Sequence, residues 1–147
     1  MRRIAIVIVM AAGLIAARSA TKTATKTATK NAATHRASTV TVQMVGSSAG
    51  YKFDPANLTI KTGDVVKFVV ASGGPHNVSF DASAIPAGAA AVLQKNMTGQ
   101  QAPLMGPLLP NNGDSYTVSF AGAPTGTYHF FCLPHQSLNM TGIITVQ

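Results

Sequence analysis

From residue 39 onward, short runs of apolar residues alternate with polar ones, and this alternation is the feature that most restricts the fold. It is clearest in TVTVQM from Thr39, VVKFVV from Val65 and SYTVSF from Ser115. A period of two residues predicts strands with one buried face and one face exposed to solvent.

Turn-forming sequences separate these runs: KTGD at 61–64, SGGP at 72–75, PNNGD at 110–114 and APTG at 123–126. Glycine, proline and asparagine at such positions favour reversals of the chain. Several short strands separated in this way predict an all-β fold, a sandwich or a barrel. The one helix that we expect is short and peripheral, in the alanine-rich stretch 84–96.

The first twenty residues have the pattern of a secretory signal peptide, which we place at 1–20. A basic start, MRR, precedes about fourteen apolar residues, and small residues follow at Ala17, Ser19 and Ala20. The apolar run is shorter than the roughly 20 residues that a membrane-spanning helix needs. We therefore expect an exported protein of the periplasm, or of the thylakoid lumen in a photosynthetic host, without stable membrane insertion after cleavage. An uncleaved anchor is the alternative.

Residues 21–37 are expected to form a spacer before a single domain at 38–147. Units of four residues, TKTA, TKTA and TKNA, make up most of the spacer and carry no large apolar side chain, so we interpret it as disordered. The formal charge of +7 comes from the N-terminal part: seven Lys and Arg precede residue 38, whereas four lysines balance four aspartates after it. A neutral domain argues against nucleic-acid binding.

The segment FFCLPHQSLNM brings three potential metal ligands within nine residues: Cys132, which is the only cysteine, then His135 and Met140. Taken singly, a buried cysteine, a surface histidine and a core methionine have ordinary structural explanations. Together, in a loop between two expected strands, a thiolate, an imidazole and a thioether form a donor set that suits copper.

A second imidazole must come from elsewhere in the chain, and we favour His76. It follows GGP and opens an expected strand, so its ring can lie at the end of the sandwich. His35 falls in the spacer, and His129 should point to the face of its strand opposite Cys132, toward solvent. The predicted metal ligands are therefore His76, Cys132, His135 and Met140.

Two imidazoles, a thiolate and a weak axial thioether let copper change oxidation state with little rearrangement, which favours one-electron transfer. Zinc is the second choice, although structural zinc sites usually have several cysteines and catalytic ones keep a bound water. A cysteine nucleophile is the alternative without a metal, but Cys132 ends an expected strand, whereas such thiols normally begin a helix. A copper-delivery protein without electron transfer is a further alternative, and it would present several Met or His side chains in an open patch.

Residues 51–146 resemble plastocyanin and its relatives, the small cupredoxins. YKFDPANLTIKTGDVVKF resembles the early strands of that family, GGPHNVSFD the segment with its first histidine ligand, and TGTYHFFCLPHQSLNMTGIITV its closing hairpin. The spacing Cys-x2-His-x4-Met, combined with Pro-His-Asn upstream, matches plastocyanin and pseudoazurin.

This resemblance implies a Greek-key β-sandwich and one type 1 copper ion, with His76, Cys132 and His135 as strong ligands and Met140 as the weak axial one. It also implies that Asn77 joins the two ligand loops by hydrogen bonding. The expected protein is a one-electron carrier and not an enzyme. We expect it to be a monomer with transient redox partners of the cytochrome, oxidase or reductase type.

Finally, we expect the edge of His135 to reach the surface, because this residue lies in a loop between strands. The neighbouring Leu133, Pro134 and Leu138, together with residues 74–75, predict an uncharged apolar rim that suits a small, transient contact with a redox partner. Packing of Leu138 beneath the loop is the alternative.

Overall fold

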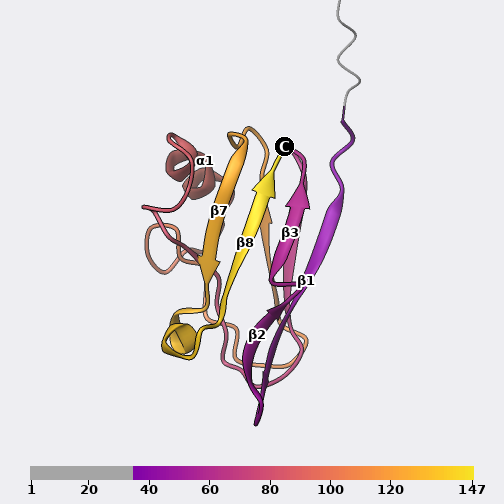
Figure 1. The fold of residues 1–147 in the computed structure, drawn as a ribbon, viewed down its shortest axis with the longest axis vertical. Helices are drawn as coiled ribbons and strands as arrows, with labels where there is room; N and C mark the ends of the chain where they lie inside the picture. Colours follow the sequence, from indigo (N-terminus) through magenta and orange to yellow (C-terminus); the bar gives the residue numbers. More distant parts are fainter. Residues whose placement is uncertain (1–34) are drawn as a thin grey trace, which may run out of the picture. The chain divides into compact units, whose positions relative to one another are not determined.

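The computed structural model describes residues 35–147, which form two four-stranded sheets (Figure 1). Their strands in chain order are β1 (Thr39–Ser47), β2 (Gly50–Asp54), β3 (Asn57–Ile60), β4 (Val65–Val70), β5 (Ser79–Phe80), β6 (Ser115–Ser119), β7 (Gly126–Phe131) and β8 (Thr141–Val146). The predicted signal peptide and residues 21–34 of the predicted spacer lie outside the described residues.

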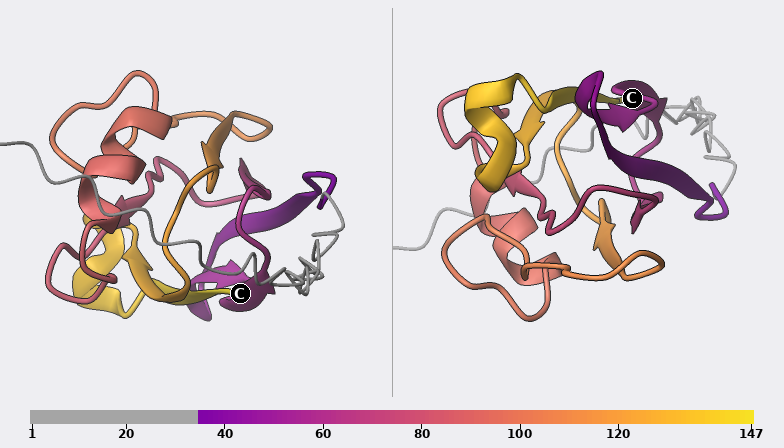
Figure 2. Two further views of the ribbon diagram at one scale, coloured as in Figure 1. Left: turned by 90° about the horizontal axis from the view of Figure 1, so that it is seen from above. Right: turned by 90° about the horizontal axis from the view of Figure 1, so that it is seen from below.

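Both sheets are mixed. One has the order β2-β1-β4-β6, in which β1 and β4 are parallel and the other pairs antiparallel. The other has the order β3-β8-β7-β5, in which only β3 and β8 are parallel. Figure 2 shows the domain along the strands from both ends. The two sheets confirm the predicted β-sandwich, in which strands distant in sequence lie side by side.

The predicted alternation determines which side chains fill the space between the sheets. In β4, Val66 and Phe68 are buried, whereas Lys67 between them is exposed. The rings of Phe53 and Phe68, from one sheet, meet the ring of Phe130 from the other at centroid distances of 4.7 and 5.4 Å. Edge-to-face packing of this kind adds to the free energy gained by burying the rings.

The helix expected at 84–96 is confirmed over its second part. α1 spans Ala89–Asn96, and Gly88 before it has a φ of 79°, a left-handed conformation that prevents the helix from starting earlier. Ala89 and Leu93 are its buried residues. Within residues 35–147, no helix is long and apolar enough to cross a membrane.

A second helical segment, η1, replaces part of the loop expected after β7. It is a 3-10 helix at Leu133–Leu138 with a proline in its first turn, and Asn139, with a φ of 60°, ends it. Figure 1 shows η1 and the turn between β1 and β2 at the same end of the sandwich. The predicted ligand residues of the Cys132–Met140 segment lie at this end.

At the end that holds the C-terminus, the carboxylate of Asp64 organises the turn between β3 and β4. It accepts hydrogen bonds from the backbone N–H groups of Ser38 at 2.7 Å and Lys61 at 2.8 Å, and from the ring of His35 at 2.7 Å. The bonds from Lys61 and Ser38, followed by that from His35, lower the pKa of Asp64 to about 2. His35, which the sequence assigns to the spacer, thus bonds to the domain.

We predict that Asp64→Asn lowers the free energy of unfolding at pH 7 by about 1–2 kcal/mol, because the ionised carboxylate accepts all three hydrogen bonds. The pKa of Asp64 is about 2 in the folded protein, against 3.8 for a free side chain, so its contribution is complete above about pH 5 and is lost as the pH falls toward 2. Denaturant unfolding between pH 2 and 7 should show this loss in the wild type but not in the variant.

Asp54→Asn is the matched control, because Asp54 pairs with Lys52 at 2.8 Å on the surface, where both side chains are more than half exposed. An exposed pair contributes little, so this change should alter stability by less than about 0.5 kcal/mol. Identical acid unfolding of the wild type and Asp64→Asn would contradict the role of Asp64.

Candidate metal centre

Two distant segments bring three potential ligands together. Cys132 directly follows β7 and His135 lies in η1, whereas His76 lies in the connection from β4 to β5. The Sγ atom of Cys132 is 3.6 Å from Nδ1 of His76 and 3.4 Å from Nδ1 of His135. One ligand atom from each of the three residues lies within 4.8 Å of the others, and all three side chains are buried. The cluster thus contains three of the four predicted ligands.

A hydrogen bond orients the ring of His76. Its Nε2 atom is 2.9 Å from the carbonyl oxygen of Ser72, which can only accept, so Nε2 carries the proton. In the neutral ring, Nδ1 then has a free lone pair, and it faces the sulfur of Cys132. Such fixing of the tautomer by an outer partner is a common property of histidine ligands.

Asn77 connects the two ligand segments in two ways. Its backbone N–H lies 3.5 Å from Sγ of Cys132, and its side-chain Oδ1 accepts a hydrogen bond from the N–H of Leu133 at 2.7 Å. The second bond is the link between the ligand loops that the resemblance implied for Asn77. It holds the residue after the thiol against the residue after His76.

The surroundings of the cluster change the proton affinity of its members. Burial raises the pKa of the Cys132 thiol, and the backbone N–H groups of Asn77 and His135 offset part of this effect. Burial, and then the neighbouring His76, lower the pKa of His135, which favours a neutral ring. A neutral imidazole is the form that binds a metal, and a metal must displace the thiol proton.

The backbone places Met140 beside the cluster. The carbonyl oxygen of Met140 accepts a hydrogen bond from the N–H of Cys132 at 3.0 Å, and its own N–H donates to the carbonyl of His135 at 3.2 Å. The segment from Cys132 to Met140 is therefore closed on itself, and the side chain of Met140 is fully buried. Ligation by its sulfur stays a prediction.

The other two histidines lie apart from the cluster. His129 is exposed, on the face of β7 opposite the buried Tyr128 and Phe130, as the period of two residues predicted. His35 bonds to Asp64 at the other end of the domain. Neither belongs to the group of residues whose ligand atoms converge.

The structure limits the exposure of His135 and adds a residue that the sequence did not indicate. His135 is 9% exposed, which is compatible with the expected edge at the surface while the rest of the side chain is buried. Tyr51, in β2, stacks on it with a centroid distance of 3.8 Å and an interplanar angle of 12°. The alternation of β2 puts Tyr51 and Phe53 on one face, but no local pattern reveals which ring Tyr51 meets.

The donor set fits copper better than the alternatives. Two imidazole nitrogens and a thiolate within a closed, buried group form the trigonal set that soft, redox-active copper prefers, whereas structural zinc sites usually have more thiolates. A nucleophilic cysteine needs a lowered pKa and access for a substrate, and burial here raises the pKa of Cys132. The geometry therefore favours metal binding over thiol catalysis.

Comparison with known proteins gives the same result. Residues 40–147 match the family described as copper binding proteins, plastocyanin/azurin family. Plastocyanin of Scenedesmus fuscus is 40% identical over 108 residues, which are 74% of this chain and 99% of that protein. Plastocyanin of Ginkgo biloba is 39% identical over 107 residues, which are 73% of this chain and 99% of that protein.

Two solved structures support the same relationship. The oxidized plastocyanin of Dryopteris crassirhizoma matches with a TM-score of 0.55 and 33% identity, over 74% of this chain and 100% of that one. Pseudoazurin of Methylobacterium extorquens AM1 matches with a TM-score of 0.51 and 28% identity, over 74% of each chain. The predicted cupredoxin-like Greek-key fold is thereby confirmed. The chain belongs to the plastocyanin/azurin family, whose members are copper electron carriers and not enzymes, and its cofactor is one type 1 copper ion.

Proposed function

We propose that this protein carries one electron at a time between redox partners outside the cytoplasm, with copper held by His76, Cys132 and His135 and, axially, by Met140. The observation that carries the proposal is the approach of two imidazole nitrogens to the buried sulfur of Cys132, at 3.4 and 3.6 Å. Bound copper would supply a one-electron couple at this group.

The protein's contribution is to keep the ligands nearly still while the charge of the site changes. The bond from His76 to Ser72 and the bond from Leu133 to Asn77 hold both ligand segments from outside the cluster. Because the ligand side chains are buried, little water surrounds them that would have to reorient. Small rearrangement in both oxidation states is what rapid electron transfer requires.

Burial also separates this proposal from copper delivery without electron transfer. A delivery protein passes its ion to another protein, so its ligands must be reached by incoming ligand atoms. Here Cys132 and His76 have no exposed surface, and His135 is 9% exposed. Burial of this kind favours retention of copper while electrons pass.

A redox partner would dock on the apolar surface around His135. Three leucines in this region are exposed, Leu138 by 54%, Leu133 by 46% and Leu108 by 42%. The segments 72–75, 107–110 and 133–139, which contribute to this end, contain no Lys, Arg, Asp or Glu. Lys52, in β2, lines the depression beside Leu138 and is the charge that the expected rim did not include. A mainly apolar patch of this kind suits a brief contact that buries less than about 1,200 Å² in total. The proposed partners are transient ones of the cytochrome, oxidase or reductase type, and the proposed carrier is a monomer.

The proposed location rests on the sequence of residues 1–20, which has the pattern of a secretory signal. Export would deliver the protein to the periplasm, or to the thylakoid lumen if the host is photosynthetic. Two relatives, from Tetradesmus obliquus and Physcomitrium patens, are described as chloroplastic plastocyanins. They support a compartment separated from the cytosol.

Copper loading tests the ligand assignment. The purified protein with one equivalent of Cu(II) should show the intense visible absorption of a thiolate-to-copper charge transfer, with the matching electron paramagnetic resonance spectrum. Cys132→Ser should remain folded and lose this band, because a hydroxyl cannot replace the soft thiolate. A copper-loaded wild type without the band, or an unchanged band in Cys132→Ser, would contradict the assignment.

Replacement of the axial residue tests Met140. Met140→Leu should keep the copper and the colour but have a higher reduction potential, because it removes only a weak donor. Met44→Leu is the matched control, since Met44 is also fully buried but lies within β1, and its potential should equal that of the wild type. Loss of copper from Met140→Leu, or an unchanged potential, would refute the axial role.

Leu138→Glu tests the docking surface. Because Leu138 is exposed, the variant should keep its colour and stability. Electron self-exchange, measured by NMR line broadening in mixtures of oxidised and reduced protein, should slow by about tenfold as two charged patches meet. Thr117→Glu, on the exposed face of β6, should leave the rate unchanged. An unaltered rate in Leu138→Glu would move the contact elsewhere.

A further inference from the structure

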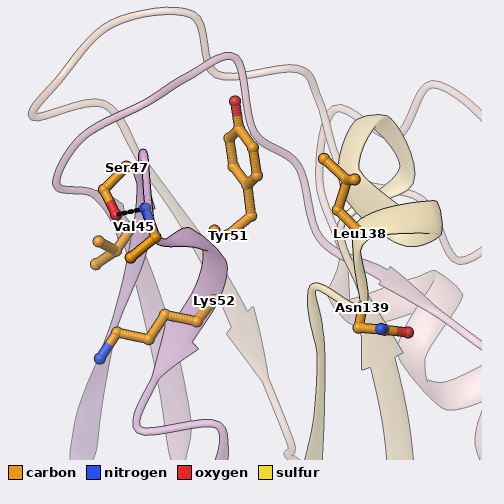
Figure 3. A pocket seen from close by; sticks show the side chains of 8 residues that line it. Val45, Ser47, Tyr51, Lys52, Leu138 and Asn139 are labelled. Carbon is orange, nitrogen blue, oxygen red and sulfur yellow. Dashed lines mark hydrogen bonds between the residues drawn. The ribbon is translucent and has the colours of Figure 1, made fainter.

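Tyr51 lies against both imidazoles of the centre. Its ring stacks on His135 at 3.8 Å and 12°, and meets His76 edge to face at a centroid distance of 6.2 Å and an angle of 69°. The two histidine rings are themselves 4.9 Å apart, at 61°. Figure 3 shows Tyr51 upright at the margin of a surface depression, across which Leu138 lies. One β2 side chain thus touches ligand residues from two other segments.

Gly46, the cross-strand neighbour of Tyr51 in the β1–β2 pair, leaves the space that this arrangement needs. A Cβ atom at Gly46 would lie 2.6 and 2.7 Å from two atoms of the Tyr51 ring and 2.9 Å from Cα of Gly73. The first contacts would displace the Tyr51 ring, and the last would push back the backbone of the loop before His76. A side chain in place of the Gly46 hydrogen would therefore disturb both the Tyr51 ring and the loop before His76.

The same glycine holds the loop that orients His76. The N–H of Gly46 donates to the carbonyl oxygen of Ser72 at 2.9 Å, and Oγ of Ser72 donates to the carbonyl of Gly46 at 2.9 Å. The carbonyl of Ser72 also accepts the bond from Nε2 of His76. Gly46 is therefore linked to His76 through Ser72 and to His135 through Tyr51.

We propose that the end of the β1–β2 pair is a support for both histidine ligands, in which Tyr51 is a positioning residue for His135 and Gly46 is the small residue that makes the support possible. The inference rests on the proposed function, because it takes His76 and His135 to be copper ligands. It goes further by assigning a role to a segment that contains none of the proposed ligands.

The face-to-face contact explains what Tyr51 does for His135. A flat ring at 3.8 Å blocks rotation of the imidazole out of its plane and keeps water from that face. η1 contains one non-helical residue, His135 itself, with φ of −119° and ψ of 17°, so the helix alone does not fix this ring. Loss of a residue that orients a ligand by hydrogen bonding typically lowers metal affinity by about 10-fold to 100-fold, and we expect an effect of similar size when the stacked ring is lost.

A role in packing alone makes a different prediction. If Tyr51 only filled space, leucine would serve nearly as well, and the state of the histidine rings would not depend on an aromatic neighbour. If Tyr51 positions His135, Tyr51→Phe should behave like the wild type, whereas Tyr51→Leu should not. The phenol hydroxyl is outside the ring contact, so its loss should have little effect.

The first experiment needs no metal. In the metal-free full-length protein, the ring current of Tyr51 should move the His135 ring-proton NMR signals upfield from those of the exposed His129. The displacement should persist in Tyr51→Phe and disappear in Tyr51→Leu. Lys52→Leu is the control for a change in the same strand: Lys52 is exposed and points away from Tyr51 (Figure 3), so the displacement should remain. Equal His135 signals in the wild type and Tyr51→Leu would overturn the proposal.

The second experiment measures Cu(I) affinity by competition with a chromogenic chelator, together with the electron paramagnetic resonance spectrum of the Cu(II) form. Tyr51→Leu should bind about 10-fold to 100-fold more weakly than the wild type and show altered copper hyperfine splitting, and Tyr51→Phe should do neither. Affinity within about twofold and an unchanged spectrum in Tyr51→Leu would show that Tyr51 only packs.

Gly46→Ala tests the second half of the proposal. In the otherwise wild-type protein, this change should weaken Cu(I) binding strongly. In Tyr51→Leu it should weaken binding less, because the ring that the added methyl group would contact is absent. If the losses in Cu(I) binding free energy caused by Gly46→Ala and Tyr51→Leu simply add in the double variant, the proposed link between Gly46 and His135 through Tyr51 is wrong. If Gly46→Ala does not fold, the Tyr51 variants decide the proposal.

These outcomes distinguish this inference from the proposed function. A wild type that binds copper without a thiolate charge-transfer band would refute the type 1 site. In that event the ring-proton signals of the metal-free protein still decide whether Tyr51 positions His135.

Discussion

The hydrogen bond between Asn77 and Leu133 is the contact on which the rest of the centre depends. It joins the N–H of the residue after Cys132 to the side chain of the residue after His76, at 2.7 Å. The ligands come from segments 56 residues apart, so a long loop of chain must be closed before they can meet. The pairing of β5 with β7 brings the two segments together, and the bond joins the residues next to the ligands.

The β1–β2 pair contributes to the centre without supplying a proposed ligand. The pair belongs to the sheet that does not contain β5 and β7. Even so, its Tyr51 stacks on His135 and its Gly46 is hydrogen-bonded to Ser72. The centre is therefore supported from both sheets, and its geometry depends on how they pack. The Phe53, Phe68 and Phe130 cluster between the sheets sets that packing.

Few charges lie near the surface proposed for electron exchange. Seven of the eleven basic residues precede residue 38, and the remaining four are balanced by four aspartates. The segments 72–75, 107–110 and 133–139 carry none of these charges, whereas Lys52, in β2, lines the depression beside Leu138. If a partner docks there as proposed, apolar side chains would be dehydrated at low cost and would hold the partner only briefly, which suits repeated turnover.

Features that depend on near neighbours along the chain could be predicted from the sequence. Period-two alternation predicted the strands and the outward direction of His129. The closeness of Cys132, His135 and Met140 in one loop predicted the types of donor atom at the site. Both predictions were possible because each of these patterns involves only a few adjacent residues. The start of α1 was misjudged because it depends on the backbone conformation of Gly88. The near-complete burial of His135 and its stacking on Tyr51 could not be predicted from the sequence. Both depend on how β2 and η1, which are distant in sequence, pack together at one end of the sandwich.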